Sequence, residues 1–140
     1  FRCLYGSRSV DTAAIFQSIG LAYSNMNDYL NALKYNVMAL RVHMLVYGEK
    51  NMITANSNST VAFTYYNLGG HKEALGHYTI ALEIKKMLVG EKDPMLVNLY
   101  KNIAHMHRAL GEESKAKEAE EKAVEIERAA AEAGGNQARK

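Results

Sequence analysis

The residue types best suited to chemistry form a polar stripe near residue 100 of this 140-residue chain. Its members recur at the spacing of one helix face: Asn98, Lys101, Asn102, His105 and Arg108. The asparagine amides could both donate to and accept from an extended peptide backbone. The lysine and arginine could pair with carboxylates. The stripe therefore predicts noncovalent binding of a linear peptide, and its cations favour an acidic one.

A second stripe with the same spacing lies 42 residues earlier in the chain. It combines polar groups with two aromatic rings: Asn56, Ser59, Thr60, Phe63 and Tyr66. Rings such as Phe63 and Tyr66 supply the apolar anchors that carry most binding energy at interfaces. We therefore expect both stripes to contribute to one peptide-binding surface. The alternative interpretation is an ordinary solvated helix face, which is usually polar and slightly charged.

No other cluster in the sequence predicts catalysis or a bound cofactor. Glu73 and His77 are one helical turn apart, but two ligands do not make a metal site. Cys3 has no neighbouring histidine that would activate it as a nucleophile. Gly69 and Gly70 are explained as helix punctuation rather than as a phosphate-binding loop. We therefore expect a non-enzymatic protein that holds no metal and no cofactor.

The composition fits a compact protein without special partners. The chain is 48% hydrophobic and 23% charged, with a net charge of +2. A single cysteine excludes an internal disulfide framework and favours a reducing compartment. No run of about 18 apolar residues occurs, so no membrane-spanning segment is expected. Residues 1–110 carry 11 Lys/Arg against 7 Asp/Glu, which makes nucleic acid an unlikely partner.

The sequence repeats its helix punctuation every 42 residues. Tyr-Gly or Val-Gly pairs end at residues 6, 48 and 90, and the residues three positions later are side chains of the N-cap type: Ser9, Asn51 and Asp93. Asn27, Gly69 and Gly111 share another column, and these types tolerate the left-handed conformation that ends a helix. Small residues recur between them in three further columns: Gly20, Ala62 and Ala104; Ala32, Ala74 and Ala116; Ala39, Ala81 and Ala123.

This register predicts an all-α protein, an α-solenoid of three antiparallel helix-turn-helix repeats. First helices are expected near residues 10–26, 52–68 and 94–110, and second helices near 28–47, 70–89 and 112–133. We expect residues 1–4 to be the end of a preceding element. The three repeats then cover residues 5–46, 47–88 and 89–130, and residues 134–140 form a polar tail. The last helix is charged on its outer face, which predicts that it caps the array; a docking surface for another partner is the alternative.

Residues 65–94, YYNLGGHKEALGHYTIALEIKKMLVGEKDP, resemble a tetratricopeptide repeat in the 42-residue form of kinesin light chains. That form has an LG…EA…Y…AL core, a long second helix and a G-x-x-H/D-P link. IGLAYSNMNDYLNALKYNVMAL (19–40) and IAHMHRALGEESKAKEAEEKAVEI (103–126) resemble the flanking repeats. The chain departs from the pattern at Asn27, Asn58 and Glu120, and at Glu132 where the next link glycine would fall. No fourth repeat is predicted.

The resemblance implies a right-handed superhelix whose first helices line a concave, peptide-binding groove. It also implies a cytoplasmic adaptor or scaffold with a protein or peptide partner; its sharpest form is a cargo or cytoskeletal adaptor. Two alternatives stay open. One is a structural spacer or self-association element of a larger assembly, and the other is an RNA-associated segment like those of clustered-mitochondria proteins.

Overall fold

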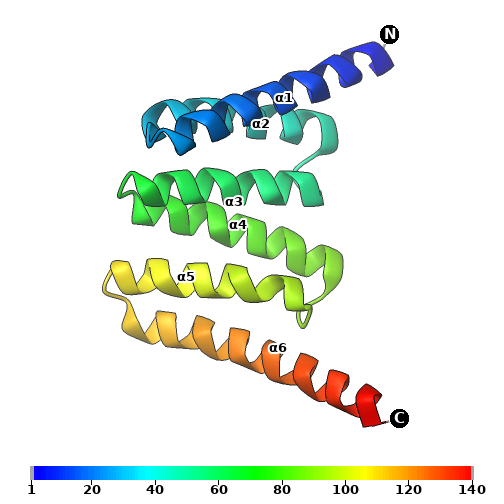
Figure 1. The fold of residues 1–140 in the computed structure, drawn as a ribbon, viewed down its shortest axis with the longest axis vertical. Helices are drawn as coiled ribbons and strands as arrows, with labels where there is room; N and C mark the ends of the chain where they lie inside the picture. Colours follow the sequence, from blue (N-terminus) through cyan, green and yellow to red (C-terminus); the bar gives the residue numbers. More distant parts are fainter. Residues whose placement is uncertain (1, 140) are drawn as a thin grey trace.

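The chain forms a stack of three antiparallel helical hairpins, which confirms the all-α solenoid (Figure 1). The structure is a computed structural model that describes residues 2–139 and the side chains of residues 9–134. The hairpins are α1 (Arg2–Asn25) with α2 (Tyr29–Tyr47), α3 (Met52–Asn67) with α4 (His71–Val89), and α5 (Val97–Ala109) with α6 (Glu113–Arg139). A short 3-10 helix, η1 (Pro94–Leu96), leads into α5. The hand of the superhelix and the repeat boundaries stay predictions.

Local chemistry explains the links between hairpins. Gly48 and Gly90 have φ of 83° and 94°, a conformation that side chains rarely adopt, and each ends a second helix. Asn51 Oδ1 then accepts from Ile53 N at 2.8 Å and caps α3. Asp93 Oδ1 accepts from Met95 N at 2.9 Å. Both predicted caps are therefore confirmed.

The turns inside the hairpins also follow the predicted column. Asn27, Gly69 and Gly111 have φ of 62°, 84° and 80°. Asn27 is the one non-glycine among the described residues with positive φ. Asparagine tolerates this conformation because its short polar side chain can bond locally, and its Oδ1 accepts from Tyr29 Oη at 3.0 Å.

The two ends of the chain differ from the prediction. Helix α1 begins at Arg2, so the predicted helix start near residue 10 and the predicted cap at Ser9 are wrong. Gly6 lies inside the helix, which is possible because a helical glycine costs only about 1 kcal/mol. Helix α6 runs to Arg139 rather than to the predicted end near residue 133, so the predicted polar tail at 134–140 is helical through residue 139. Its two glycines weaken a helix without breaking it.

Small residues bring the helices of each hairpin together. The alanines of the second-helix columns are buried: Ala32, Ala74 and Ala116 are fully buried, and Ala39, Ala81 and Ala123 nearly so. The continuous apolar core lies in α3 to α6, where Leu96, Leu99, Ile103 and Met106 pack between α4 and α6. These residues dominate the contact between the second and third hairpins.

The contact between the first and second hairpins is polar instead. Buried polar side chains of the described residues all lie on α2 and α3: Asn36, His43, Thr54, Ser57, Asn58 and Thr64. Asn36 Nδ2 donates to Thr64 Oγ1 at 3.0 Å, and His43 Nδ1 lies 2.5 Å from Ser57 Oγ. The cause is in the sequence, since Ser57 and Thr64 occupy the columns of Leu99 and Met106.

Candidate protein-binding surface

The predicted stripe on α5 is exposed along its length. Asn98, Lys101, Asn102, His105 and Arg108 are all solvent-accessible and lie on one side of the helix. On α3, Asn56 and Thr60 are exposed, and Phe63 keeps 54% of its surface accessible. Ser59 and Tyr66 are half-buried. We name these residues of α3 and α5 together the first-helix surface.

A ring cluster joins the two helices of this surface. His105 Nε2 on α5 lies 3.2 Å from Tyr66 Oη on α3, and the two rings meet edge to face at 5.4 Å. Phe63 packs beside Tyr66 with ring centroids 6.3 Å apart. His71, at the start of α4, meets the other edge of Tyr66 at 5.7 Å. The cluster therefore offers an exposed apolar ring, Phe63, beside hydrogen-bonding groups.

The two cations of the stripe are already paired with α6. Lys101 Nζ lies 3.4 Å from Glu127 Oε1, and Arg108 bonds the carboxylates of Glu113 and Glu120. Hydrogen bonds to Glu120 and Glu113 raise the pKa of Arg108, and the bond to Arg108 lowers the pKa of Glu120. An acidic ligand must therefore compete with carboxylates of the protein's own last helix. The spacing of residues in the sequence did not reveal that these carboxylates pair with Lys101 and Arg108.

Ser59 has a distinct environment on this surface. Its Oγ is buried and has no hydrogen-bond partner, and it is the one such side-chain atom found among the described residues. An unpaired buried polar atom costs about 1–3 kcal/mol. The neighbouring threonines behave differently, because Thr60 Oγ1 donates to Asn56 O and Thr64 Oγ1 to Thr60 O.

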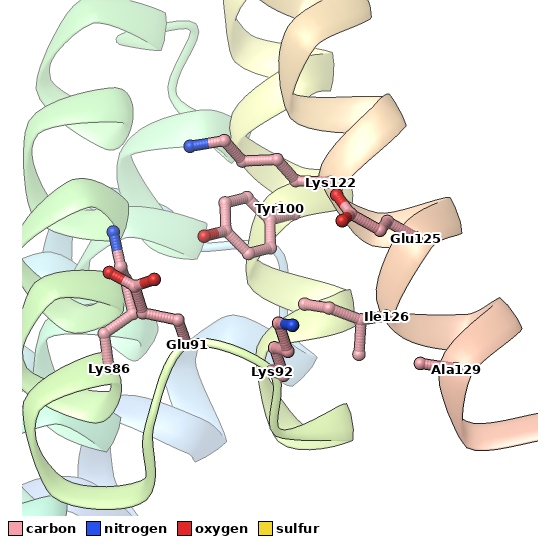
Figure 2. Close-up of a pocket in the computed structure, with 8 residues that line it drawn as sticks. All are labelled: Lys86, Glu91, Lys92, Tyr100, Lys122, Glu125, Ile126 and Ala129. Atoms are coloured by element: carbon pink, nitrogen blue, oxygen red, sulfur yellow. The ribbon is translucent and has the colours of Figure 1, made fainter. Parts of the chain in front are cut away.

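Two hollows lie on the opposite side of α5, over Tyr100. Figure 2 shows the first, of about 200 Å³, in which the Tyr100 ring stands between Lys86 of α4 and Ile126 of α6, while Lys122 passes above it. Its charges are mixed, because Glu91 and Glu125 line it together with Lys86, Lys92 and Lys122. The second hollow, of about 270 Å³, lies across Tyr100 and includes Leu82, Ile103 and His107. The sequence analysis did not identify either hollow.

His77, considered above as a metal ligand, makes structural contacts instead. His77 Nδ1 lies 3.0 Å from Asn58 Oδ1, and its ring stacks on Tyr65 with centroids 5.6 Å apart. This contact satisfies the buried Asn58, one of the departures from the repeat pattern. Within the part of the chain that the structure describes, no group of three or more His, Cys, Asp or Glu could hold a metal ion. The side chain of Cys3 lies outside the described residues.

Stacked hairpins with one exposed, ring-bearing face on their first helices define a class of protein: helical-repeat solenoids that present side chains to other proteins. The family model described as Tetratricopeptide repeat matches residues 11–86 and 53–129. The chain belongs to the tetratricopeptide repeat family. It is accordingly a protein–protein interaction module of a family that is generally a non-catalytic scaffold.

Solved structures share this fold. BtubC (BKLC) from P. vanneervenii superposes with a TM-score of 0.78 at 24% identity, over 84% of this chain and 47% of that one. The TPR domain of Arabidopsis FLU gives 0.72 at 15% identity, over 83% of this chain and 94% of that one. MamA gives 0.66 at 20% identity, over 89% and 63%. The chain therefore spans less than two thirds of BtubC and of MamA.

No curated protein matches the chain in sequence. Among the described residues, none of the helices is both long and apolar enough to cross a membrane.

Proposed function

We propose that the first-helix surface binds a linear peptide of a partner protein. The observation that carries this proposal is the ring cluster of Phe63, Tyr66 and His105, which spans α3 and α5 and leaves Phe63 54% exposed. An exposed aromatic ring supported by packed neighbours is a typical interface anchor.

Exposed amide groups lie on the same two helices as this anchor. Asn98 and Asn102 are exposed on α5, and Asn56 is exposed on α3. In the described structure the side chains of Asn98 and Asn102 make no hydrogen bond, so both amides are free to bond a peptide backbone. Phe63 then provides affinity and the asparagines hold an extended chain in register.

The test selects linear peptides that bind the wild-type protein and measures their affinity by calorimetry. Phe63→Ala should weaken binding about 30-fold, the effect of losing an anchor worth ~2 kcal/mol. Asn102→Ala should weaken it about 5- to 10-fold, as expected for one lost hydrogen bond. Leu45→Ala is the matched control, because Leu45 is 86% exposed on α2, away from this surface. Equal affinities for wild type, Phe63→Ala and Asn102→Ala would contradict the proposal.

The sharper form of the proposal is a cytoplasmic adaptor of the kinesin light chain kind, associated with cargo or the cytoskeleton. Its support is the 42-residue repeat period and the G-x-x-D-P link at Gly90 to Pro94. An acidic partner has weaker support, because Lys101 and Arg108 are already paired with α6. High salt should therefore change the affinity of a selected peptide only slightly. A steep loss with salt would instead support an acidic motif.

One observation favours self-association as a second candidate. Ile15 on α1 is 58% exposed, whereas the residues in its column, Ser57 and Leu99, are 3% and 4% exposed. Met26, in the turn that follows α1, is 66% exposed. Light scattering over a range of concentrations tests this reading: the mass should rise with concentration, and Ile15→Glu should abolish the rise. A wild-type protein that stays monomeric at high concentration rejects it.

A further inference from the structure

One position of the second helices carries a ring in two hairpins and none in the third. In the first hairpin, Tyr35 of α2 stacks on Tyr23 with centroids 5.8 Å apart and tilts against Phe16 at 6.1 Å. In the second, His77 of α4 stacks on Tyr65 at 5.6 Å. In each hairpin, this ring of the second helix packs against a ring of the first helix.

The third hairpin has Ala119 at this position, 42 residues after His77. The residues in the columns of its ring partners are Tyr100 and His107, which both line the 270 Å³ hollow together with Ala119. The hollow therefore lies where the other two hairpins place a ring. The small side chain of Ala119 stands there in place of a ring.

The size and lining of the hollow suit an aromatic ring. An engineered apolar cavity of roughly 150 Å³ is large enough to bind benzene. Tyr100, Ile103 and Leu82 give an apolar floor, each only 6% exposed. His107 is held in place because its Nδ1 lies 3.1 Å from Glu112 Oε1. The floor of the hollow is thus formed by side chains that are already packed in place.

The rim of the hollow is electrostatically complementary to a ring. Two ammonium groups, Lys115 and Lys122, and one carboxylate, Glu118, surround the opening. Lys122 Nζ already lies 5.9 Å from the centroid of the Tyr100 ring (Figure 2). Cations are attracted to the electron-rich face of an aromatic ring. Lys115 is already paired with Glu112 at 3.2 Å, so Lys122 is the cation that favours an aromatic occupant over an aliphatic one.

We propose that the hollow over Ala119 binds one aromatic side chain of a partner protein, of the tyrosine type. The ring lies on Ala119 between Tyr100 and His107, as Tyr35 lies against Phe16 and Tyr23. This site is on the opposite side of α5 from the first-helix surface, since Tyr100 and Asn102 are two residues apart on a helix. It goes beyond the proposed function and does not depend on it.

The first experiment titrates the protein with N-acetyl-tyrosinamide and follows the methyl signals of its alanines by NMR. A bound ring should shift the Ala119 methyl upfield in a saturable way, while the Ala62 methyl on the far side stays unchanged. N-acetyl-leucinamide is the matched aliphatic probe and should bind at least fivefold more weakly. No saturable shift with the tyrosine probe, or equal binding of both probes, overturns the proposal.

The second experiment supplies the ring within the chain. Ala119→Tyr should fill the hollow, raise the unfolding temperature by about 3 °C or more and abolish binding of the tyrosine probe. Lys117→Tyr, on the exposed outer side of α6, is the control and should leave probe binding unchanged. A folded Ala119→Tyr variant that still binds the probe, or one whose unfolding temperature falls, shows that a ring does not fit the hollow and overturns the proposal.

Discussion

Gly20 offers a sharp test of how the first hairpin is held. Its column contains Ala62 and Ala104, so a methyl group at this position is tolerated in the other two hairpins. In α1, however, a Cβ at Gly20 would overlap Asn36 Oδ1 and lie 3.0 Å from Asn36 Cγ. Asn36 is 5% exposed, and its amide donates to Thr64 Oγ1 across the polar contact between hairpins. Gly20→Ala should therefore disturb the contact between α2 and α3.

Two opposing effects set the change in unfolding free energy that Gly20→Ala should cause. Replacing a helical glycine by alanine gains about 1 kcal/mol of unfolding free energy. Displacing Asn36 leaves a buried amide unsatisfied and costs about 1–3 kcal/mol. The net effect of Gly20→Ala in the wild-type protein should be a loss of up to about 2 kcal/mol. In an Asn36→Ala background the obstacle is gone, and the same substitution should stabilise by about 1 kcal/mol.

Urea denaturation followed by circular dichroism measures all four members of this double-mutant cycle. The expected signature is a change of sign, with a coupling between Gly20 and Asn36 of about 1–3 kcal/mol. Ala62→Gly is a control for the helix effect alone and should destabilise by at least about 1 kcal/mol. If Gly20→Ala stabilised both backgrounds equally, the close approach of Asn36 would not be real and the reasoning would fail.

Three further outcomes follow from burial, titration and capping. Leu99→Ala should lower the free energy of unfolding by about 2–5 kcal/mol, because Leu99 is buried in the core with 4% of its surface exposed. Leu45→Ala is the control: Leu45 is 86% exposed, so this change should alter stability by less than about 0.5 kcal/mol in the same denaturation assay. Burial lowers the pKa of His43 and His77 below 6.5, so the unfolded chain binds protons at a higher pH than the folded chain does. The free energy of unfolding should therefore fall as the pH drops below 6.5. A His43→Gln, His77→Gln double variant should lose less stability over this range, and an unchanged pH profile would reject this cause. Asn51→Ala should remove the cap of α3 and cost about 1 kcal/mol, with Asn51→Asp as the conservative variant that restores most of it.

The hairpin boundaries inside the chain were predictable because their causes are local. Gly48 and Gly90 adopt a backbone conformation that few other residues accept, and Asn51 and Asp93 cap the following helices by bonds to residues two positions away. The same logic failed at Gly6, where the residue types match the repeat but the helix continues. A glycine permits a helix end but does not require one, because a glycine inside a helix costs only about 1 kcal/mol.

The candidate surface was predictable in part. Helical periodicity correctly identified which α5 side chains are exposed, because that depends on 3.6-residue geometry alone. The pairing of Lys101 with Glu127 and of Arg108 with Glu120 was not foreseen, since it depends on how α6 lies beside α5. The hollow over Ala119 had a visible signal: the column Tyr35, His77 and Ala119 loses its ring in the third hairpin. Comparing large residues across the repeats would have found it.

Helix α5 supports both proposed binding sites, and its two sides can be altered separately. Asn102 belongs to the first-helix surface, and Tyr100 lines the hollows on the other side. The apolar contact of Leu99 and Ile103 with their neighbours holds the helix between them. Because the two sites lie on opposite sides of α5, a change at Asn102 should not alter ring binding over Ala119, nor should a folded Ala119→Tyr variant alter peptide binding at Phe63. Loss of both activities from either substitution in a folded protein would mean that the two sides are not independent, and that one of the two binding sites is wrongly placed.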